Sequence, residues 1–267
     1  MAPPLRIRLR RLIRFLKVPV LIAIGLTLVV RLFFSSSKPK SDGYSKALVV
    51  ATTQDTFPKA AKWLAKVPAG WTIHRYATDL DPTAELTKKQ RQLGLRPVVA
   101  NKGHEAMAYL TYIVDHYHAL PDVVFFHRDK RHARYQDDVP AEEQVANLRS
   151  AYVVAKGYAS ARCVPECENV VELPDKTVDF DAFRYHGREV HLATLIRTFL
   201  HKEEEMPTKL AAPCCSQFAA SREAIHRRPL DWWKRLRQWL VDAPLDSASA
   251  RKLMEQTWHL WLGEKAE

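Results

Sequence analysis

Apolar residues recur along this chain at two spacings that alternate from Ala47 onward. Short apolar runs bounded by polar residues are typical of buried strands, whereas apolar residues three and four positions apart are typical of helices. Segments 47–51, 57–66 and 71–76 follow one another as strand, helix and strand, and such a unit favours a parallel sheet. The pattern therefore predicts an α/β fold with a single open, mostly parallel sheet and helices on both faces.

The same two spacings predict the remaining elements. Further strands are expected at 97–100, 122–126 and 218–220. Further helices are expected at 85–93, 104–118, 141–154, 190–201, 231–241 and 248–262. The helix at 104–118 has the clearest pattern, because Ala106, Leu110, Ile113 and Tyr117 recur at helical spacing. Residues 163–184 show neither spacing and are expected to be irregular.

The first 40 residues follow a different pattern. Val18–Val30 carries no charge and is apolar on all sides, and the apolar stretch extends to Phe34 if the Arg31 side chain reaches back to the membrane interface. The resulting length of about 17 residues is at the short end of what spans a bilayer. Nine Lys or Arg and no Asp or Glu occur in this segment. The positive-inside rule then keeps the N-terminus in the cytosol.

This N-terminal pattern predicts a type II single-pass membrane protein of the secretory pathway, in the Golgi or the endoplasmic reticulum. We expect a cytosolic basic tail at 1–17, a transmembrane signal-anchor at 18–34, a flexible stem at 35–45 and a lumenal α/β domain at 46–267. Two alternatives stay open. One is a signal peptide cleaved near Ser35–Ser37, and the other is an amphipathic surface helix, which the all-round apolar run disfavours.

The basic excess of the chain belongs to its N-terminal segment. The chain has 41 Lys and Arg against 30 Asp and Glu, and without the first 40 residues the balance is 32 against 30. A nucleic-acid-binding domain carries its basic excess on its own surface. The membrane is therefore an expected partner, and nucleic acid is not.

Several common catalytic motifs are missing from the sequence. Its eight glycines never lie within five residues of one another, so neither a P-loop nor a G-x-G-x-x-G motif occurs. The G-x-S-x-G and H-E-x-x-H motifs are missing as well. Common ATPases, classical dehydrogenases, α/β-hydrolases and zincins are therefore disfavoured.

The four cysteines form two close pairs in the sequence, Cys163 with Cys167 and Cys214 with Cys215. Adjacent cysteines rarely bridge each other, so we expect the first pair to form disulfides with the second in either of two registers, in the oxidising lumen. Four buried thiols are the alternative. The C-x3-C and adjacent spacings are unlike those of a tetrahedral zinc site.

Polar side chains follow the strand expected at 122–126, and they are His127, Asp129, His132, Asp137 and Asp138. Ligands of open α/β sheets bind just beyond the carboxyl ends of strands. Two imidazoles and three carboxylates at such a place can hold a divalent cation. The alternative is a solvated loop in which these acids pair with Arg128, Lys130 and Arg131.

Two further segments carry candidate chemistry. Asn101, Lys102 and Gly103 open the helix at 104–118, and helix N-termini attract phosphate, although Asn101 is also an ordinary helix cap. Segment Cys214–Pro229 has polar clusters on both sides of a short apolar run. A disulfide-tethered turn with structural ion pairs is the alternative for the second segment.

Asn101–Asp138 and Cys214–Pro229 together resemble a family of fungal, membrane-anchored proteins known only as domain-of-unknown-function family 3431. The resemblance covers most of Ala47–Gly263, including the closing tryptophan-rich helix with Trp258. It implies membership of that family. It implies no activity, because the family itself is uncharacterised.

A wider likeness is to membrane-anchored glycosyltransferases that use nucleotide sugars. The shared features are a short anchor, a stem, a first strand ending in a Thr-rich turn (here Ala51–Asp55) and an acidic metal motif after a buried strand. His127–Asp129 matches that motif with His in place of the first carboxylate, whereas Asp79–Asp81 has the literal spacing but follows an earlier strand. The likeness implies a glycosyltransferase A-like sheet, although a fold does not determine a function.

The first functional hypothesis is therefore a glycosyltransferase-like enzyme that uses a nucleotide sugar, a carbohydrate acceptor and Mn²⁺ or Mg²⁺. The expected metal ligands, which would neutralise the diphosphate leaving group, are His127, Asp129 and His132. The candidate bases are Glu105, Asp137 and Asp138. The candidate substrate-binding residues are Thr52, Asp55, Asn101, Lys102, Gly103, Gln217, Arg222 and Glu223.

Two other functions stay open. A non-catalytic lumenal module that binds a carbohydrate or a protein is favoured by Arg128 and Arg131, whose charges oppose a metal ion. A metal-dependent hydrolase would use the same His and Asp cluster.

Overall fold

The computed structural model describes residues 42–130, 139–161, 170–212 and 216–266. The chain divides into two compact units, 1–42 and 43–267, and every helix and strand named below belongs to the second. The predicted anchor and all four cysteines lie outside the described residues. Among the helices that are described, none is both long and apolar enough to cross a membrane.

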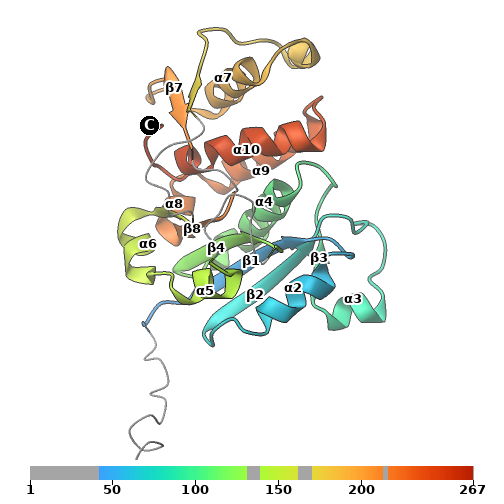
Figure 1. Cartoon of the computed structure of the whole chain (residues 1–267). Coiled ribbons are helices and arrows are strands. Elements are labelled where there is room, and N and C mark those ends of the chain that lie inside the picture. The colour runs from blue at the N-terminus through green and yellow to red at the C-terminus, as the bar shows by residue number, and fades with distance from the viewer. Residues whose placement is uncertain (1–41, 131–138, 162–169, 213–215, 267) are drawn as a thin grey trace, which may run out of the picture. The chain divides into compact units, whose positions relative to one another are not determined.

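A six-stranded sheet forms the centre of the domain, in the order β3-β2-β1-β4-β8-β5 (Figure 1). Its strands are β1 Lys46–Thr52, β2 Trp71–Ala77, β3 Leu95–Pro97, β4 Val123–Arg128, β5 Tyr158–Ser160 and β8 Phe218–Ser221. Strands β3, β2, β1 and β4 are parallel, and β8 runs antiparallel to both of its neighbours, β4 and β5. The mixed α/β fold with a mostly parallel sheet is thus confirmed.

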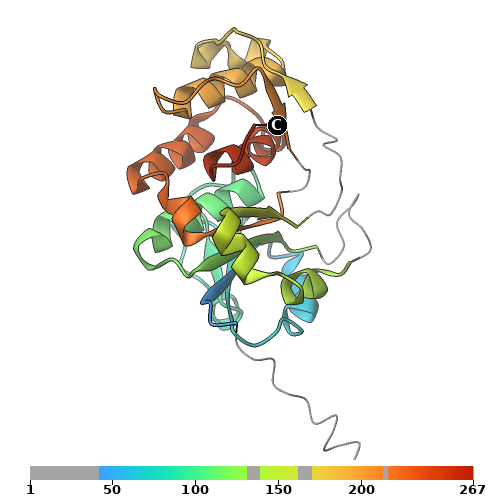
Figure 2. The ribbon, with the colours of Figure 1, turned by 90° about the vertical axis from the view of Figure 1, so that its left-hand side faces the viewer.

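Helices cover both faces of this sheet (Figures 1 and 2). One face carries α2 Phe57–Leu64, α5 Ala141–Ala146 and α6 Ser150–Lys156. The other carries α4 Glu105–His116, α9 Leu230–Asp242 and α10 Ser247–Trp261. The short helices α3 Lys88–Gln92 and α8 Arg222–His226 complete the layers.

Side chains alternate between two hydrophobic cores along the buried strands. In β4, Val123 and Phe125 lie in the core with α2, whereas Val124 and Phe126 lie in the core with α4. Each strand therefore needs apolar residues at consecutive positions, which is typical of parallel strands covered on both faces. Because the two-residue period continues to the strand end, His127 is directed to the α2 face and Arg128 to the α4 face.

A second, two-stranded sheet lies against the α10 side of the domain. It pairs β6 Val170–Glu172 with β7 Lys209–Ala211 in antiparallel fashion, and it is joined by the 3₁₀ helix Phe180–Tyr185 and by α7 Arg188–Phe199. The side chain of Trp232, on α9, donates its Nε1–H to the carbonyl oxygen of Phe199 at 2.9 Å. This layer shares the core of α4, α9 and α10.

Three predicted elements differ from the observed ones. The helix expected at 141–154 is two helices, because Arg149 adopts an extended conformation (φ −87°, ψ 92°) between α5 and α6. The helix expected at 85–93 begins only after Thr87, whose side chain caps α3 in a capping box. The strand expected at 97–100 lies at Leu95–Pro97, where Leu95 reaches the core and Pro97 has no N–H to continue the ladder. The missed strands β5, β6 and β7 have three residues each, too few to show a period.

Candidate functional site

The sheet changes its direction of growth between β1 and β4. From β1 the chain adds β2 and β3 on one side, and after α4 it adds β4 on the other side of β1. Ligands of open α/β sheets bind at such a switch point, at the carboxyl ends of the strands. The candidate site is therefore this carboxyl edge, which we define as Thr52–Thr56, Asn101–Glu105, His127–Lys130 and Ser216–Gln217.

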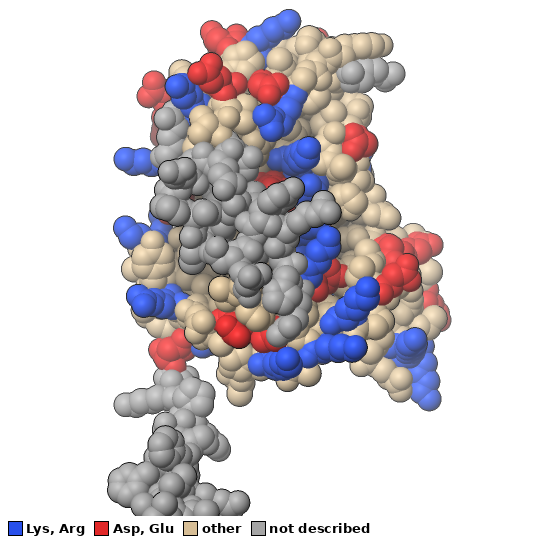
Figure 3. Space-filling view, viewed as in Figure 1, with Lys and Arg blue, Asp and Glu red and all other residues tan. Residues whose placement is uncertain are grey.

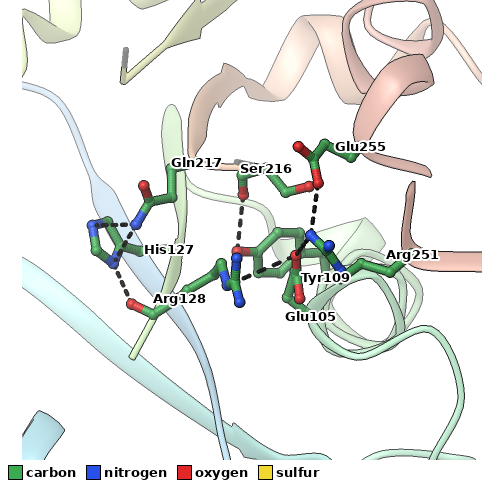
Figure 4. Close-up of polar contacts among 8 residues, drawn as sticks. All are labelled: Glu105, Tyr109, His127, Arg128, Ser216, Gln217, Arg251 and Glu255. Atoms are coloured by element: carbon green, nitrogen blue, oxygen red, sulfur yellow. Dashed lines mark hydrogen bonds and ion pairs between the residues drawn. The ribbon is translucent and has the colours of Figure 1, made fainter. Parts of the chain in front are cut away.

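His127 lies on the α2 face and is completely buried. Its ring centroid is 5.2 Å from that of Trp63. Its Nδ1 is hydrogen-bonded to the carbonyl oxygen of Arg128, and its Nε2 lies 3.1 Å from Nε2 of Gln217 (Figure 4). The same Nε2 lies 3.3 Å from Oε1 of Gln144. The carbonyl oxygen of Arg128 can only accept, so Nδ1 carries the proton of the neutral ring and Nε2 accepts from the Gln217 amide. Oε1 of Gln144, itself an acceptor, then lies beside Nε2 without a proton between them. Burial lowers the pKa of His127, which favours the neutral ring.

Asp129 continues the ladder beyond β4 and is fixed by three hydrogen bonds. Its N–H donates to the carbonyl oxygen of Ala51 at 3.0 Å, and its carbonyl oxygen accepts from Nε1 of Trp63 at 3.0 Å. Its Oδ2 accepts from the hydroxyl of Thr52 at 2.9 Å. Two of the predicted site residues, Thr52 and Asp129, are thus direct neighbours at the ends of β1 and β4.

The described residues do not fit a divalent cation at this edge. They contain no group of three His, Cys, Asp or Glu side chains that can hold a metal ion. Both ring nitrogens of His127 are already in hydrogen bonds inside the protein. The predicted ligand His132 lies outside the described residues, as do the predicted bases Asp137 and Asp138. The predicted cation stays a prediction.

The turn between β1 and α2 closes on itself. The hydroxyl of Thr56 accepts from the N–H of Thr53 at 3.1 Å, and the hydroxyl of Thr53 accepts from the N–H of Thr56 at 3.2 Å. The N–H of Gln54 lies 3.0 Å from both carboxylate oxygens of Asp79. Asp55 is exposed at the tip of the turn. These three amides therefore donate to side chains of the turn or of Asp79, and they do not form a phosphate cradle.

Glu105 is the centre of a polar group on the opposite face of the sheet. It begins α4 and is only 4% exposed. Its Oε1 lies 3.8 Å from Nε of Arg128 and 3.5 Å from Nη1 of Arg251, which also contacts Oε2 of Glu255 at 2.7 Å (Figure 4). Arg128 is the most exposed member, with 29% of its side chain accessible. The group holds two cations and two anions in partly buried surroundings, where electrostatic interactions are stronger than in water.

Strained backbone borders this polar group on two sides. Tyr109, one helical turn after Glu105, is fully buried and donates its hydroxyl to the carbonyl oxygen of Ser216 at 3.0 Å. Burial raises the pKa of Tyr109 well above its ordinary value, so the hydroxyl keeps its proton. Ser216 has φ 47°, and His104, directly before Glu105, has φ 49° and ψ −125°. Such conformations are costly outside glycine and are concentrated at functional sites.

The residues that open α4 have structural partners on α9. The ammonium group of Lys102 donates to the carbonyl oxygens of Ala243, at 2.8 Å, and of Leu245, just beyond the end of that helix. A Cβ at Gly103 would lie 2.9 Å from Cδ1 of Leu240. Asn101 is exposed. Lys102 and Gly103 therefore join α4 to α9, and only Asn101 stands without a described structural contact.

The segment that follows the cysteine pair is divided between the two ends of the sheet. Because β8 is antiparallel to β4, Gln217 lies beside His127 whereas Arg222 lies beside Asp122, before the start of β4. Arg222 donates to Oδ1 of Asp122 at 2.8 Å. Arg222 and the exposed Glu223 are thus at the amino edge of the sheet, away from the other predicted site residues.

The sequence did not predict four residues of the site: Tyr109, Gln144, Arg251 and Glu255. Helical spacing carried part of the signal, because Glu105 and Tyr109 are four residues apart, as are Arg251 and Glu255. The contact between Glu105 and Arg251 spans 146 residues. No local pattern reports such a contact.

Comparison with known proteins identifies a family for the chain. Residues 48–267 match the family model described as Protein of unknown function (DUF3431). No curated protein matches the chain. No solved structure matches it either. The matched range includes the whole carboxyl edge.

Proposed function

The chain belongs to the DUF3431 family of proteins of unknown function, and from that premise we propose that its α/β domain is a glycosyltransferase-like enzyme. The proposed substrates are a nucleotide-sugar donor and a carbohydrate acceptor, bound at the carboxyl edge. The observation that carries the proposal is the switch point between β1 and β4, with the Glu105 polar group beside it. The glycosyltransferase A-like sheet implied by the sequence is part of the same proposal.

Arg128 is the proposed contact for the donor's diphosphate. It ends β4 at the switch point, and it is the most exposed member of the Glu105 polar group. Lys130 is exposed two residues further on. Guanidinium groups bind phosphate oxygens through paired hydrogen bonds. The face drawn in Figure 3 carries many Lys and Arg side chains, with Asp and Glu side chains among them. Cationic side chains would then neutralise the leaving diphosphate without any step assigned to a metal ion.

Glu105 is the proposed base. In the proposed reaction, the acceptor hydroxyl forms a bond to the anomeric carbon of the donor sugar while the bond from that carbon to the phosphate oxygen breaks. The hydroxyl proton passes to the Glu105 carboxylate, and the nucleoside diphosphate leaves with its electron pair. Arg251 contacts both Glu105 and Glu255, so it is a positioning residue that orients the carboxylate.

Release of nucleoside diphosphate tests this proposal. The purified full chain is incubated with a panel of nucleotide sugars and simple acceptors, and product is quantified for the parent and for three variants. We expect Glu105→Gln to lower the rate by about 10²-fold or more, since general bases contribute that much. We expect Arg128→Gln to weaken donor use by about 10-fold. Glu223→Gln is the matched control, because it makes the same change at the amino edge.

A second candidate is a non-catalytic module that binds a carbohydrate or a protein. It is favoured by the ion pairs of Glu105 with Arg128 and Arg251, which already occupy the proposed base. Donor or glycan binding by calorimetry, with no release of nucleoside diphosphate above the blank, would select this module. Release that survives Glu105→Gln unchanged would reject the assignment of the base.

The membrane topology belongs to the proposal as well. We propose a single-pass type II protein of the secretory pathway with the α/β domain in the lumen. The support is the apolar stretch at 18–34 and the nine-to-zero charge bias of the first 40 residues.

A further inference from the structure

A second group of polar and aromatic side chains lies on the β3 side of the sheet, where β2, β3 and α4 meet. It comprises His74 and Tyr76 of β2, Arg96 of β3, and Tyr112 and His116 of α4. The ring centroids of His74 and His116 are 4.8 Å apart, and Tyr112 lies 4.9 Å from His74 and 4.5 Å from His116. We call these five residues the histidine–arginine cluster.

The hydrogen bonds of the cluster define which of its nitrogens carry protons. Nδ1 of His116 is 3.1 Å from the carbonyl oxygen of Tyr112, one helical turn earlier, so Nδ1 is the donor. Nε2 of His116 then accepts from Nη1 of Arg96 at 3.3 Å. The guanidinium of Arg96 is exposed, and it is held at the surface by a neutral imidazole in place of a carboxylate.

The neighbours of His74 that lower its pKa are a second imidazole and two arginines. The pKa of His74 is lowered to about 4, first by burial and then by the neighbouring His116, Arg96 and Arg75. The acidic group nearest to the cluster on α4 is Asp115, and its carboxylate lies 3.8 Å from Nη1 of Arg237 on α9. No carboxylate of the described residues forms an ion pair with Arg96 or hydrogen-bonds to either histidine ring.

The hydroxyl of Tyr76 is a second, independent sign of a ligand. Tyr76 is 1% exposed, and its hydroxyl has no hydrogen-bond partner in the described part of the chain. Burial, and after it the Asp115 carboxylate, raises the pKa of Tyr76 to about 12, and the nearby Arg96 guanidinium opposes both effects. The hydroxyl is therefore a protonated donor beside Arg96. Leaving a buried donor unpaired costs about 1–3 kcal/mol in proteins generally, which a bound acceptor would recover.

We propose that the histidine–arginine cluster is a binding site for a small tetrahedral oxyanion, a phosphate group. The donors would be the Arg96 guanidinium, the Tyr76 hydroxyl and a ring N–H group of His74. His116, whose Nδ1–H is used by the Tyr112 carbonyl and whose Nε2 accepts from Arg96, would orient the guanidinium. The site lies on β2, β3 and the C-terminal half of α4, apart from the Glu105 polar group at the start of that helix. It does not depend on the proposed enzymatic function.

Binding of phosphate to this site is linked to protonation of His74. A bound anion raises the pKa of His74 above the value of about 4 that its surroundings give it, so a proton is taken up on binding. Affinity is therefore expected to increase as the pH falls from about 8 to about 6, in the range where histidines respond to their surroundings. The charged groups beside the cluster are Arg96 and Arg75, which act on His74, and Asp115, which acts on Tyr76.

Calorimetric titration of the purified full chain with inorganic phosphate tests the proposal. We expect Arg96→Gln to weaken binding by about 10-fold, through loss of a charge-assisted hydrogen bond. Arg96→Lys keeps the charge but not the planar guanidinium, so its affinity for phosphate should lie between that of the parent and that of Arg96→Gln. Arg235→Gln is the matched control, because Arg235 is an exposed arginine on α9. Its affinity should equal that of the parent.

A second titration distinguishes the sources of the phosphate group. Phenyl phosphate that binds more tightly than inorganic phosphate, with the same dependence on Arg96, indicates a phosphomonoester. Inorganic phosphate that binds at least as tightly indicates the free ion. Absence of binding by both probes, equal affinity in Arg96→Gln and the parent, or weaker binding at the lower pH would each overturn the proposal. The melting temperatures of the variants, measured without phosphate, show that they fold.

Discussion

At the scale of single residues, Gly103 shows how one missing side chain lets two helices meet. Its φ of 68° is unfavourable for other residues, and a Cβ there would lie 2.9–3.2 Å from three atoms of Leu240. Gly103→Ala should therefore destabilise the domain twice, through backbone strain of about 1 kcal/mol and overpacking of about 1–3 kcal/mol. The midpoint of urea unfolding of the purified chain measures the sum.

Gly70→Ala is the matched control for this substitution. Gly70 also has a positive φ, 98°, but nothing lies within 4 Å of a Cβ at that position. Gly70→Ala should therefore show only the destabilisation that comes from backbone strain. Equal destabilisation of the two variants would show that Leu240 moves aside at no cost, and that contact with α9 does not require glycine.

At the scale of elements, an ion pair ties the loop after α7 to the start of α9. Arg228 is buried, and its two Nη atoms donate to the two carboxylate oxygens of Glu204 at 2.9 and 2.7 Å. Burial raises the pKa of Glu204, but hydrogen bonds from Arg228 and the His201 N–H outweigh it, so the pKa is below its ordinary value. A lowered carboxyl pKa stabilises the fold above its unfolded-state value and loses that contribution as the pH falls through the folded-state value.

Glu204→Gln should therefore destabilise the domain near neutral pH, mainly because it leaves the buried Arg228 charge without its ionised partner. Glu204 is 41% exposed, so solvent screening keeps this cost near about 1 kcal/mol. The difference between parent and variant should shrink as the pH falls below the ordinary glutamate pKa of about 4.3 and through the lower folded-state pKa, where the parent's carboxyl group also becomes neutral. Urea unfolding across this pH range gives both quantities. Glu172→Gln changes an exposed pair with Lys209 and should cost less than about 0.5 kcal/mol. A constant difference at every pH would contradict the role assigned to Glu204.

At the scale of the whole molecule, the distribution of charge predicts the topology. The first 40 residues hold nine basic and no acidic side chains, whereas the remainder is nearly balanced. A tag at the C-terminus should therefore be protected from protease in intact microsomes and digested once detergent is added. A tag at the N-terminus should be digested in both conditions. Digestion of the C-terminal tag in intact microsomes would reverse the proposed orientation.

The alternation of strands and helices was determined by the sequence alone, because apolar spacing is a local property. The strands near 47–51, 71–76, 122–126 and 218–220 were all predicted, and so was helix α4. Thr52 and Asp129 could be placed near the site for the same reason, since each follows the carboxyl end of a predicted strand. Their standing as functional residues stays a prediction.

The partners of these residues were decided only by the tertiary structure. Gln217 and Arg222 lie at opposite ends of β8, and the antiparallel direction of β8 places Gln217 at the carboxyl edge. The apolar pattern of a short strand does not predict whether the strand is parallel or antiparallel to its neighbours. Lys102 caps α9, and Glu105 meets Arg251 on α10, because three helices pack on one face of the sheet. Such contacts depend on how segments distant in the sequence pack together in one core. Apolar spacing predicts which side of a segment is buried, but it does not predict which other segment covers that side.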